Sequence, residues 1–213
     1  MYATERQDLV NKISVKGITD KAVLKAIGDV ERHKFVPDAM KHHAYNDVAL
    51  PIGYGQTISQ PFTVAFMTQA LKVNPGDKVL EVGTGSGYQA AILFNMGMEV
   101  YSIERNVDIF YKTRKLLDEL GLRINTKCGD GTLGWEEYSP YNGIIVTAGS
   151  PTIPNSLKKQ LALGGRMVVP VGDKISQRLK IVKKIEADKF EIEDIPEFAF
   201  VPLIGREGWK DKG

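Results

Sequence analysis

A glycine-rich segment directly after an apolar run is the part of this sequence best suited to bind a ligand. Val79–Val82 reads as a buried strand, and Gly83, Gly85 and Gly87 follow it before a helical run that begins at Tyr88. Glycines at the carboxyl end of a parallel strand let the backbone turn sharply and approach a ligand closely. The spacing is not that of a GxGxxG dinucleotide loop, because the third glycine comes one residue early. The lysine of a phosphate-binding P-loop is also missing.

Three carboxylates accompany this segment, each where a predicted strand ends. Glu81 stands just before the glycines, Glu104 follows the second strand, and Asp130 follows the third. An acid beside the glycines repels a pyrophosphate but attracts a cation, such as the ammonium and sulfonium groups of S-adenosylmethionine. An acid after the second strand is placed to accept from ribose hydroxyls, and one after the third can accept from an adenine amino group. Solvated turn residues would have no reason to collect at one sheet edge, so the sequence predicts a site for a cationic nucleoside.

The elements that must position these acids alternate between strand and helix. Such alternation predicts an α/β fold with a mostly parallel sheet and helices on both faces. Two further segments, 178–186 and 190–195, alternate apolar and polar residues around a turn and predict an antiparallel hairpin. The expected strands are residues 78–82, 99–103, 123–128, 143–147 and 166–171, with a last extended segment at 198–203. The expected helices between them are residues 60–72, 88–96, 106–120 and 155–163.

The first part of the chain differs from this core. Residues 4–50 read as polar helices, and the stretch from Leu50 to Ser59 is rich in Pro and Gly and reads as a loop. We therefore expect one domain over 1–213, with a helical extension and a substrate-side loop in residues 1–60 and the α/β core in residues 61–213.

Local signals fix several expected helix ends. Thr19 can cap a helix with an apolar face, Ser59 can cap the helix that starts near Gln60, and Asn106 can cap a later one. Gly164-Gly165 is expected to close the helix over 155–163.

Composition excludes several classes of protein. The chain has 213 residues and a net charge of +2 without a long basic block, so a nucleic-acid-binding surface is not expected. It has no apolar run of membrane-spanning length and no signal-like N-terminus, so no membrane association is expected. The single Cys128 cannot form an intrachain disulfide, and His33, His42 and His43 lack metal-ligand spacing. We expect a cytoplasmic, metal-free protein that acts as a monomer.

Longer motifs give a more specific indication. Arg32–Pro37, the segment Leu50–Pro61 with Ile58-Ser59-Gln60-Pro61 at its end, the glycine-rich segment and Phe200–Leu203 occur in the order and spacing of one known family. Over nearly its whole length the sequence resembles the protein-L-isoaspartate O-methyltransferases. The glycine-rich segment is common to many methyltransferases, whereas the segment around Ser59 is far more specific to this family.

The resemblance implies a Rossmann-like class I methyltransferase fold and a defined reaction. A methyl group passes from S-adenosylmethionine to the free α-carboxyl of an L-isoaspartyl residue in a damaged protein or peptide, and S-adenosylhomocysteine is the other product. The ester then closes spontaneously to a succinimide, which begins repair of the chain. The damaged polypeptides are the implied partners.

The resemblance also implies residue roles. Ser59 matches the active-site serine of the family, and substrate contacts are implied for Ser59, Thr147, Ala148, Val201, Pro202 and Leu203. We expect the cofactor to contact Ile58, Glu81, Gly83, Thr84, Gly85, Ser86, Gly87, Glu104, Arg105, Asp130 and Gly131. Two positions depart from the family pattern: Asn142 stands where relatives usually have Asp, and Phe62 where many have His or Tyr.

This chemistry needs no general base. A carboxyl group with a pKa of about 4 is already ionised at neutral pH, so the task of the protein is to align nucleophile, methyl group and leaving sulfur. We expect the Ser59 hydroxyl and amides at the following helix start to hold the substrate carboxylate, although Ser59 could equally be only a helix cap. The alternatives are a methyltransferase for RNA or a small molecule, a nicotinamide-dependent oxidoreductase, and a non-catalytic binding module.

Overall fold

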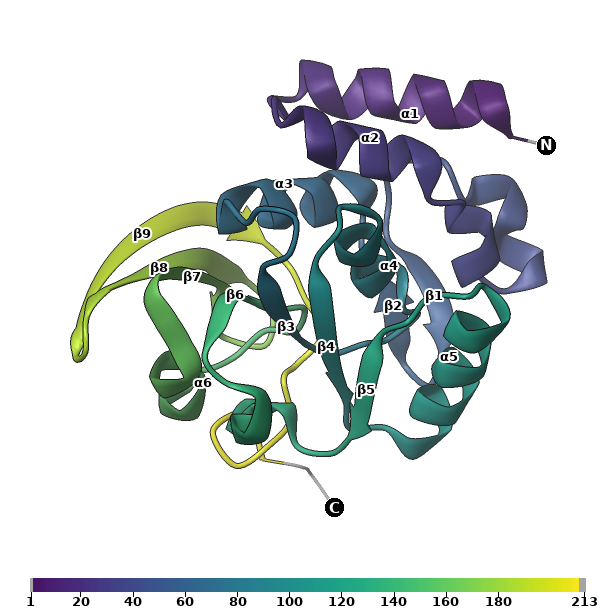
Figure 1. Ribbon diagram of the computed structural model, residues 1–213. Coiled ribbons are helices and arrows are strands. Elements are labelled where there is room, and N and C mark those ends of the chain that lie inside the picture. The colour runs from purple at the N-terminus through teal and green to yellow at the C-terminus, as the bar shows by residue number, and fades with distance from the viewer. Residues whose placement is uncertain (1, 211–213) are drawn as a thin grey trace.

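The five predicted core strands lie side by side and parallel. In the computed structural model, which describes residues 2–210, they belong to a seven-stranded sheet (Figure 1). The parallel strands are β3 (Lys78–Val82), β4 (Glu99–Glu104), β5 (Asn125–Cys128), β6 (Tyr141–Val146) and β7 (Leu161–Gly172). The predicted hairpin is β8 (Gln177–Glu186) and β9 (Lys189–Phe198), both antiparallel. The strand order is β5-β4-β3-β6-β7-β8-β9, which confirms the predicted fold class.

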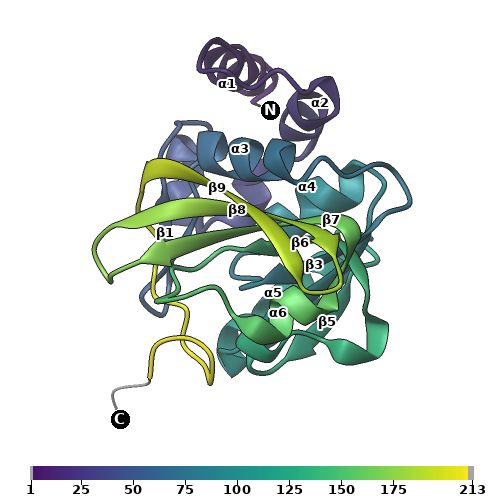
Figure 2. The ribbon, with the colours of Figure 1, turned by 90° about the vertical axis from the view of Figure 1, so that its left-hand side faces the viewer.

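Helices cover both faces of the sheet because its strands are apolar on both sides. Val79, Val100 and Ile145 pack against α3 (Pro61–Leu71) and α4 (Tyr88–Asn95). Their neighbours Leu80 and Ile144 point the other way and pack with α6 (Asn155–Gln160). This two-residue alternation places α3 and α4 on one face and α6 on the other, as Figure 2 shows. A further helix, α5 (Val107–Glu119), follows β4 and contacts it and β5.

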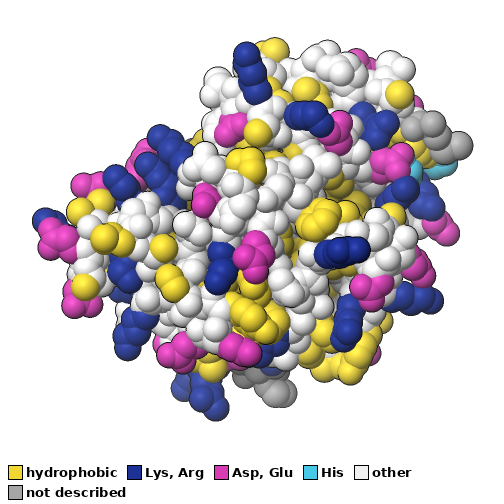
Figure 3. Space-filling view, in the orientation of Figure 1, with side chains coloured by type: hydrophobic (Ala, Val, Ile, Leu, Met, Phe, Trp, Pro, Cys, Tyr) yellow, Lys and Arg dark blue, Asp and Glu magenta, His cyan; other side chains and the backbone are white. Residues whose placement is uncertain are grey.

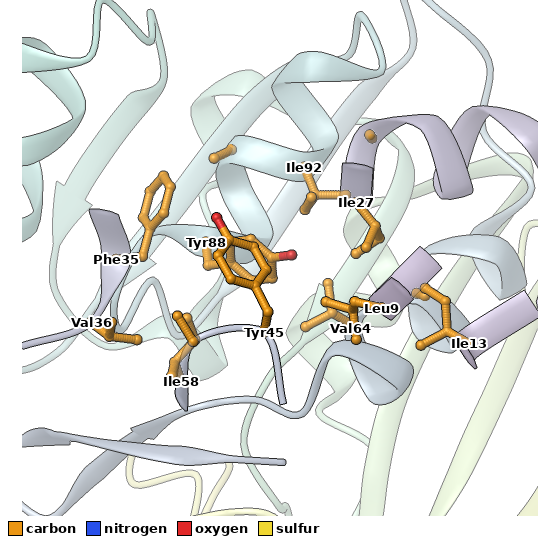
Figure 4. Close-up of a cluster of buried hydrophobic side chains, with 14 of the residues drawn as sticks. Leu9, Ile13, Ile27, Phe35, Val36, Tyr45, Ile58, Val64, Tyr88 and Ile92 are labelled. Atoms are coloured by element: carbon orange, nitrogen blue, oxygen red, sulfur yellow. The ribbon is translucent and has the colours of Figure 1, made fainter. Parts of the chain in front are cut away.

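The N-terminal extension lies on the face covered by α3 and α4. It consists of α1 (Ala3–Val15), α2 (Lys21–Asp29) and the 3₁₀ helices η1 (Arg32–Phe35) and η2 (Asp38–His43). Leu9 and Ile27 from the extension share one apolar cluster with Tyr88 and Ile92 of α4, and Figure 4 shows these side chains meeting. The extension is therefore packed onto the helix that follows the glycine-rich segment.

Residues 50–58 form a small hairpin where a loop was predicted. Strand β1 (Leu50–Gly53) pairs antiparallel with β2 (Gln56–Ile58). The connecting residues Tyr54 and Gly55 have φ values of 54° and 67°. Positive φ at both central positions is the requirement of a type I′ hairpin turn. The glycines that suggested a loop thus allow a turn between two strands.

Two expected helix ends were wrong. Asp20, not Thr19, caps α2, because its side chain accepts from the backbone N–H groups of Ala22 and Val23. The pair Gly164-Gly165 lies inside β7 instead of closing α6, which ends at Gln160. Gly164 has a φ of 77°, and the pairing of β6 with β7 shifts register between Tyr141 and Gly143, so this pair accommodates a bulge in the sheet.

We expect Asp20→Ala to lower the free energy of unfolding by about 1 kcal/mol, because two amides at the start of α2 lose their acceptor. Urea denaturation followed by circular dichroism measures this loss. Thr19→Ala is the matched control and should change stability much less. A larger effect from Thr19→Ala than from Asp20→Ala would contradict the capping geometry.

Candidate active site

The predicted site residues lie around one pocket at the carboxyl ends of β3, β4 and β6. All of them except Gly87 and Asp130 line it. The lining residues are Gln56, Thr57, Ile58, Ser59, Val64, Glu81, Val82, Gly83, Thr84, Gly85, Ser86, Tyr88, Gln89, Ile103, Glu104, Arg105, Asn106, Gly131, Thr147, Ala148, Val201, Pro202, Leu203 and Ile204. Residues 56–59 and 201–204 thus come to the strand ends from far away in the sequence, and the chain after β9 returns beneath the central strands (Figure 1).

The glycine-rich segment needs glycine at the places where neighbouring side chains approach it. Gly83 has a φ of 96°, and a Cβ atom there would lie 2.5 Å from the Thr147 hydroxyl oxygen. Gly87 has a φ of 85°, and a Cβ atom there would lie 2.9 Å from a methyl carbon of Thr113. A larger residue would force the segment away from Thr147 at the end of β6 or from α5, so the course of the segment beside the pocket depends on these glycines.

Three hydroxyl groups hold the same segment in place. The Thr147 hydroxyl donates to the Gly83 carbonyl at 2.6 Å, and the Thr113 hydroxyl donates to the Gly85 carbonyl at 2.6 Å. The Thr84 and Ser102 hydroxyls lie 2.6 Å apart. Thr113 and Ser102 were missed in the sequence analysis, although a serine inside the apolar strand at 99–103 was a usable signal. Because the Thr147 hydroxyl is committed to the backbone, its predicted contact with substrate stays a prediction.

Glu81 is fully buried at the pocket wall. One carboxylate oxygen accepts from the Ser102 hydroxyl, and the other is buried with no hydrogen-bond partner among the described residues. Burial, together with the nearby charge of Glu104, raises the pKa of Glu81 to about 8. A buried carboxylate oxygen without a donor is costly unless a cation or a donor reaches it. Glu81 therefore fits a positively charged ligand in this pocket.

Glu104 is oriented by the backbone on both sides. Its carboxylate accepts from the N–H of Gly85 at 2.9 Å and from the N–H of Asn106 at 2.9 Å, one on each oxygen. Each carboxylate oxygen can accept a second hydrogen bond. The side chain is thus fixed at the pocket edge with capacity for two ligand hydroxyls, as a ribose requires.

Asp130 is engaged by the C-terminal part of the chain. One of its oxygens accepts from the N–H and the hydroxyl of Thr132, and the other accepts from the N–H of Arg206 at 2.8 Å. The pocket is lined nearby by Gly131 and Ile204 instead. The proposed contact of Asp130 with adenine stays a prediction that depends on the remaining acceptor capacity of this carboxylate.

Ser59 is not a helix cap. Gln60 occupies the N-cap position of α3 without a side-chain cap bond, and Pro61 has no N–H to offer. The next amide, Phe62 N–H, already donates to the Asp47 carboxylate at 2.8 Å. The expected anion site at the start of this helix is therefore at least partly filled by Asp47. Ser59 itself lines the pocket, so its proposed substrate contact rests on the hydroxyl.

A buried arginine positions the Ser59 segment. The Arg32 side chain is fully buried, and its guanidinium donates to the carbonyls of Ser59 at 3.0 Å, Val48 at 3.1 Å and Ala44 at 2.5 Å. Burial lowers the pKa of Arg32 from its ordinary value, but an arginine stays charged at neutral pH. Arg32 thus ties the N-terminal extension to a residue that lines the pocket.

Two large aromatic side chains near the sheet lie away from the pocket. Trp135 packs edge-on and Tyr138 tilted against Tyr101, and neither lines the pocket. Basic and acidic side chains are interspersed on the face shown in Figure 3. Within residues 2–210, no group of three His, Cys, Asp or Glu side chains could hold a metal ion. No helix in the described part of the chain is long and apolar enough to cross a membrane.

Comparison with known proteins agrees with this geometry. The family model for protein-L-isoaspartate(D-aspartate) O-methyltransferase matches residues 4–208. The chain belongs to this family. The protein-L-isoaspartate O-methyltransferase of Chlorobium phaeobacteroides strain DSM 266 is 53% identical over 205 residues, which cover 96% of this chain and 94% of that protein. The Chlorobaculum tepidum protein of the same name is 51% identical, with 98% of each chain covered.

Solved structures show the same fold. One described as a protein-L-isoaspartate O-methyltransferase has a TM-score of 0.88 and 29% identity, over 95% of this chain and 67% of that one. Another, from Plasmodium falciparum and described as a complex with S-adenosyl-L-homocysteine, has a TM-score of 0.79 over 93% of this chain and 98% of that one. Its 22% identity shows the fold alone.

The two departures from the family pattern have different positions. Asn142 lies at the start of β6, at the opposite sheet edge from the pocket, where its side-chain oxygen accepts from the Lys78 N–H at 3.0 Å. An aspartate could accept the same hydrogen bond, so this departure does not touch the site. Phe62 lines a second hollow next to the pocket.

We expect the stability of the ligand-free protein to fall as pH rises from about 5 to about 8. The pKa of Glu81 is about 8 in the folded chain, so the folded chain keeps a proton that the unfolded chain releases, and stability decreases with pH in that window. Urea denaturation at several pH values measures the slope. Glu81→Gln should flatten it, whereas the exposed control Glu136→Gln should not. A slope that survives in Glu81→Gln would show that another group titrates.

Proposed function

We propose that this chain transfers a methyl group from S-adenosylmethionine to the free α-carboxyl of L-isoaspartyl residues in damaged proteins and peptides. The ester then closes to a succinimide without further help. One observation carries this proposal: in a chain of this family, the buried Glu81 carboxylate and Ser59 line the same pocket. One part of the pocket suits a cationic nucleoside, and the adjacent part suits a polypeptide.

The residues present fit S-adenosylmethionine. Glu81 and the segment Gly83–Gly87 would face its cationic amino-acid part, and Glu104 would accept from the ribose hydroxyls. Ile58, Thr84, Ser86, Arg105 and Gly131 would complete its surroundings, with Asp130 at the adenine end. When bound, this cofactor supplies a methyl group activated by the positive charge on its sulfur.

The protein then has to hold a substrate that is already a nucleophile. An isoaspartyl carboxylate is ionised at neutral pH, so no side chain needs to remove a proton. The Ser59 hydroxyl donates a hydrogen bond to this carboxylate and fixes its direction, while Arg32 holds the Ser59 backbone. Thr147, Ala148 and the segment Val201–Leu203 form the opposite wall on the substrate side.

Exclusion of water supports the same step. Ile58, Val82, Ile103 and Leu203 are buried apolar residues in the pocket lining. An anion and a cation combine into neutral products in this reaction, so removing water destabilises the separated charges more than the transition state. These walls therefore favour methyl transfer without any acid or base.

We also propose that the chain works as a monomer in the cytoplasm. Its single Cys128 is exposed as a free thiol, which suits a reducing compartment.

The activity is tested with methyl-labelled S-adenosylmethionine and two peptides that differ only in an aspartyl or isoaspartyl linkage. We expect base-labile label in the isoaspartyl peptide alone, because only that linkage leaves a free α-carboxyl in the chain. Equal labelling of both peptides, or no labelling of either by folded protein, would overturn the proposal.

Ser59→Ala should lower kcat/KM for the isoaspartyl peptide by about 10- to 100-fold, the cost of one hydrogen bond to a charged group. The dissociation constant of S-adenosylhomocysteine, measured by calorimetry, should stay within about two-fold and serves as the control for folding. A change of only two- to three-fold in kcat/KM would show that the Ser59 hydroxyl does not contact the substrate.

A further inference from the structure

A second hollow opens beside the cofactor pocket on its substrate side. The two spaces share Thr57, Ser59, Thr147 and Val201. From this shared edge the hollow runs between α3 and the end of β9, which lie next to each other in Figures 1 and 2. A ligand that reaches Ser59 can therefore extend directly into the second hollow.

This hollow, which we name the aromatic groove, is walled by Phe62, Phe66, Phe198 and Phe200, with Ile195. Neighbouring rings are in contact along its length. The centroid distances are 6.0 Å for Phe62–Phe66, 5.8 Å for Phe66–Phe198 and 6.3 Å for Phe198–Phe200. Its other lining residues are Ala49, Gln60, Thr63 and Ala199. No charged side chain is among the described residues that line it.

The rings are only half-buried, and the backbone is fixed at two of them, Phe62 and Phe200. The Phe62 N–H donates to the Asp47 carboxylate at 2.8 Å, and the Lys16 ammonium lies 5.6 Å from the centre of the Phe62 ring. The Phe200 N–H donates to the Gln177 side chain at 2.7 Å. A preformed apolar surface that remains partly exposed gains free energy when another apolar group covers it.

The segment Phe200–Leu203 offers a bound peptide few backbone hydrogen bonds. Val201 and Leu203 use their shared edge to pair with Gly149, through bonds of 2.7 Å and 2.8 Å. On the opposite edge, the Phe200 N–H is taken by Gln177, and Pro202 has no N–H. The segment Phe200–Leu203 thus has no N–H free on that edge to donate to a substrate strand. Side-chain contacts therefore gain weight in the binding of a peptide here.

The position of the aromatic groove relative to Ser59 matches that of a residue next to the modified one in a bound peptide. An extended chain advances about 3.3 to 3.6 Å per residue, so a residue next to an isoaspartyl group at Ser59 lies at the start of the aromatic groove. A charged side chain entering the groove would lose water, and none of the described lining residues offers it an opposite charge, whereas an apolar one would cover the rings.

We propose that the aromatic groove binds the side chain adjoining the isoaspartyl residue on one flank and selects apolar or aromatic residues against charged ones. This inference rests on the proposed function. It adds a specificity site that contacts the substrate but takes no part in the methyl transfer.

The test uses isoaspartyl peptides of otherwise uniform glycine and alanine sequence, with Phe, Ala, Lys or Glu placed on either flank. For the wild-type protein we expect kcat/KM on one flank to be about ten-fold or more higher with Phe than with Glu. In the double variant Phe66→Ala, Phe198→Ala this ratio should fall to about two-fold or less. The control Phe190→Ala removes a half-buried ring of β9 outside the groove and should keep the wild-type ratio.

A second variant distinguishes loss of selectivity from loss of folding. Phe198→Lys should raise kcat/KM for the Glu-flanked peptide above its wild-type value, a gain that misfolding cannot produce. Equal kcat/KM for all flanking residues in the wild-type protein, a ratio that survives in the double variant, or no gain in Phe198→Lys would each overturn the inference. If no isoaspartyl peptide is methylated, the proposed function itself fails, and that outcome is distinct from methylation without selectivity.

Discussion

The close approach between Gly83 and the Thr147 hydroxyl is the contact on which the pocket geometry depends. It joins β3 to β6 at the point where both strands end, and the same hydroxyl donates to the carbonyls of Val82 and Gly83. With this floor fixed, Glu104 can accept from the Gly85 N–H, and Ser102 can reach Glu81. The rigid part of the site is thus a set of backbone contacts, and the acids take their directions from it.

The substrate side is built on a different principle. It comes from segments outside the parallel core, and a buried cation connects them. Arg32 gathers three carbonyls from residues 44–59 and lies beside the Tyr88 ring, 5.6 Å from its centre. Tyr88 begins α4 directly after the glycine-rich segment. A displacement of the N-terminal extension would therefore move the Ser59 segment and disturb the packing at the start of α4 together.

The sequence was most informative where a functional residue lies within or next to a segment whose local residue pattern predicts its structure. Strand β3, the glycines and Glu104 were predictable, because an apolar run, positive φ and a strand-end acid leave local signs. The hairpin at 50–58 was not, since glycine and proline allow a loop and a tight turn equally. Gly164-Gly165 failed for a similar reason: glycine after a helix can also accommodate a bulge.

Contacts made over long sequence distances left no such sign. The engagement of Asp130 by Arg206, 76 residues away, could not be read from either segment. The hydrogen bond from the Phe62 N–H at the start of α3 to the Asp47 carboxylate could not be predicted either, and it changes the interpretation of Ser59. The aromatic groove is a product of the same kind, because α3 and the end of β9 meet only in the folded chain.

The fastening of residues 205–209 has a consequence for biosynthesis. The Glu207 carboxylate accepts from both the N–H and the hydroxyl of Ser156, and the Trp209 indole donates to the Gly149 carbonyl. These contacts hold Leu203 and Ile204 against the pocket. The glycine-rich segment, which lines the same pocket, lies more than a hundred residues earlier in the chain. A growing polypeptide on the ribosome therefore contains a complete sheet core before it contains a complete pocket. The pocket wall formed by Leu203 and Ile204 is thus fixed only after residues 207 and 209 have left the ribosome, once all strands of the sheet have already been made.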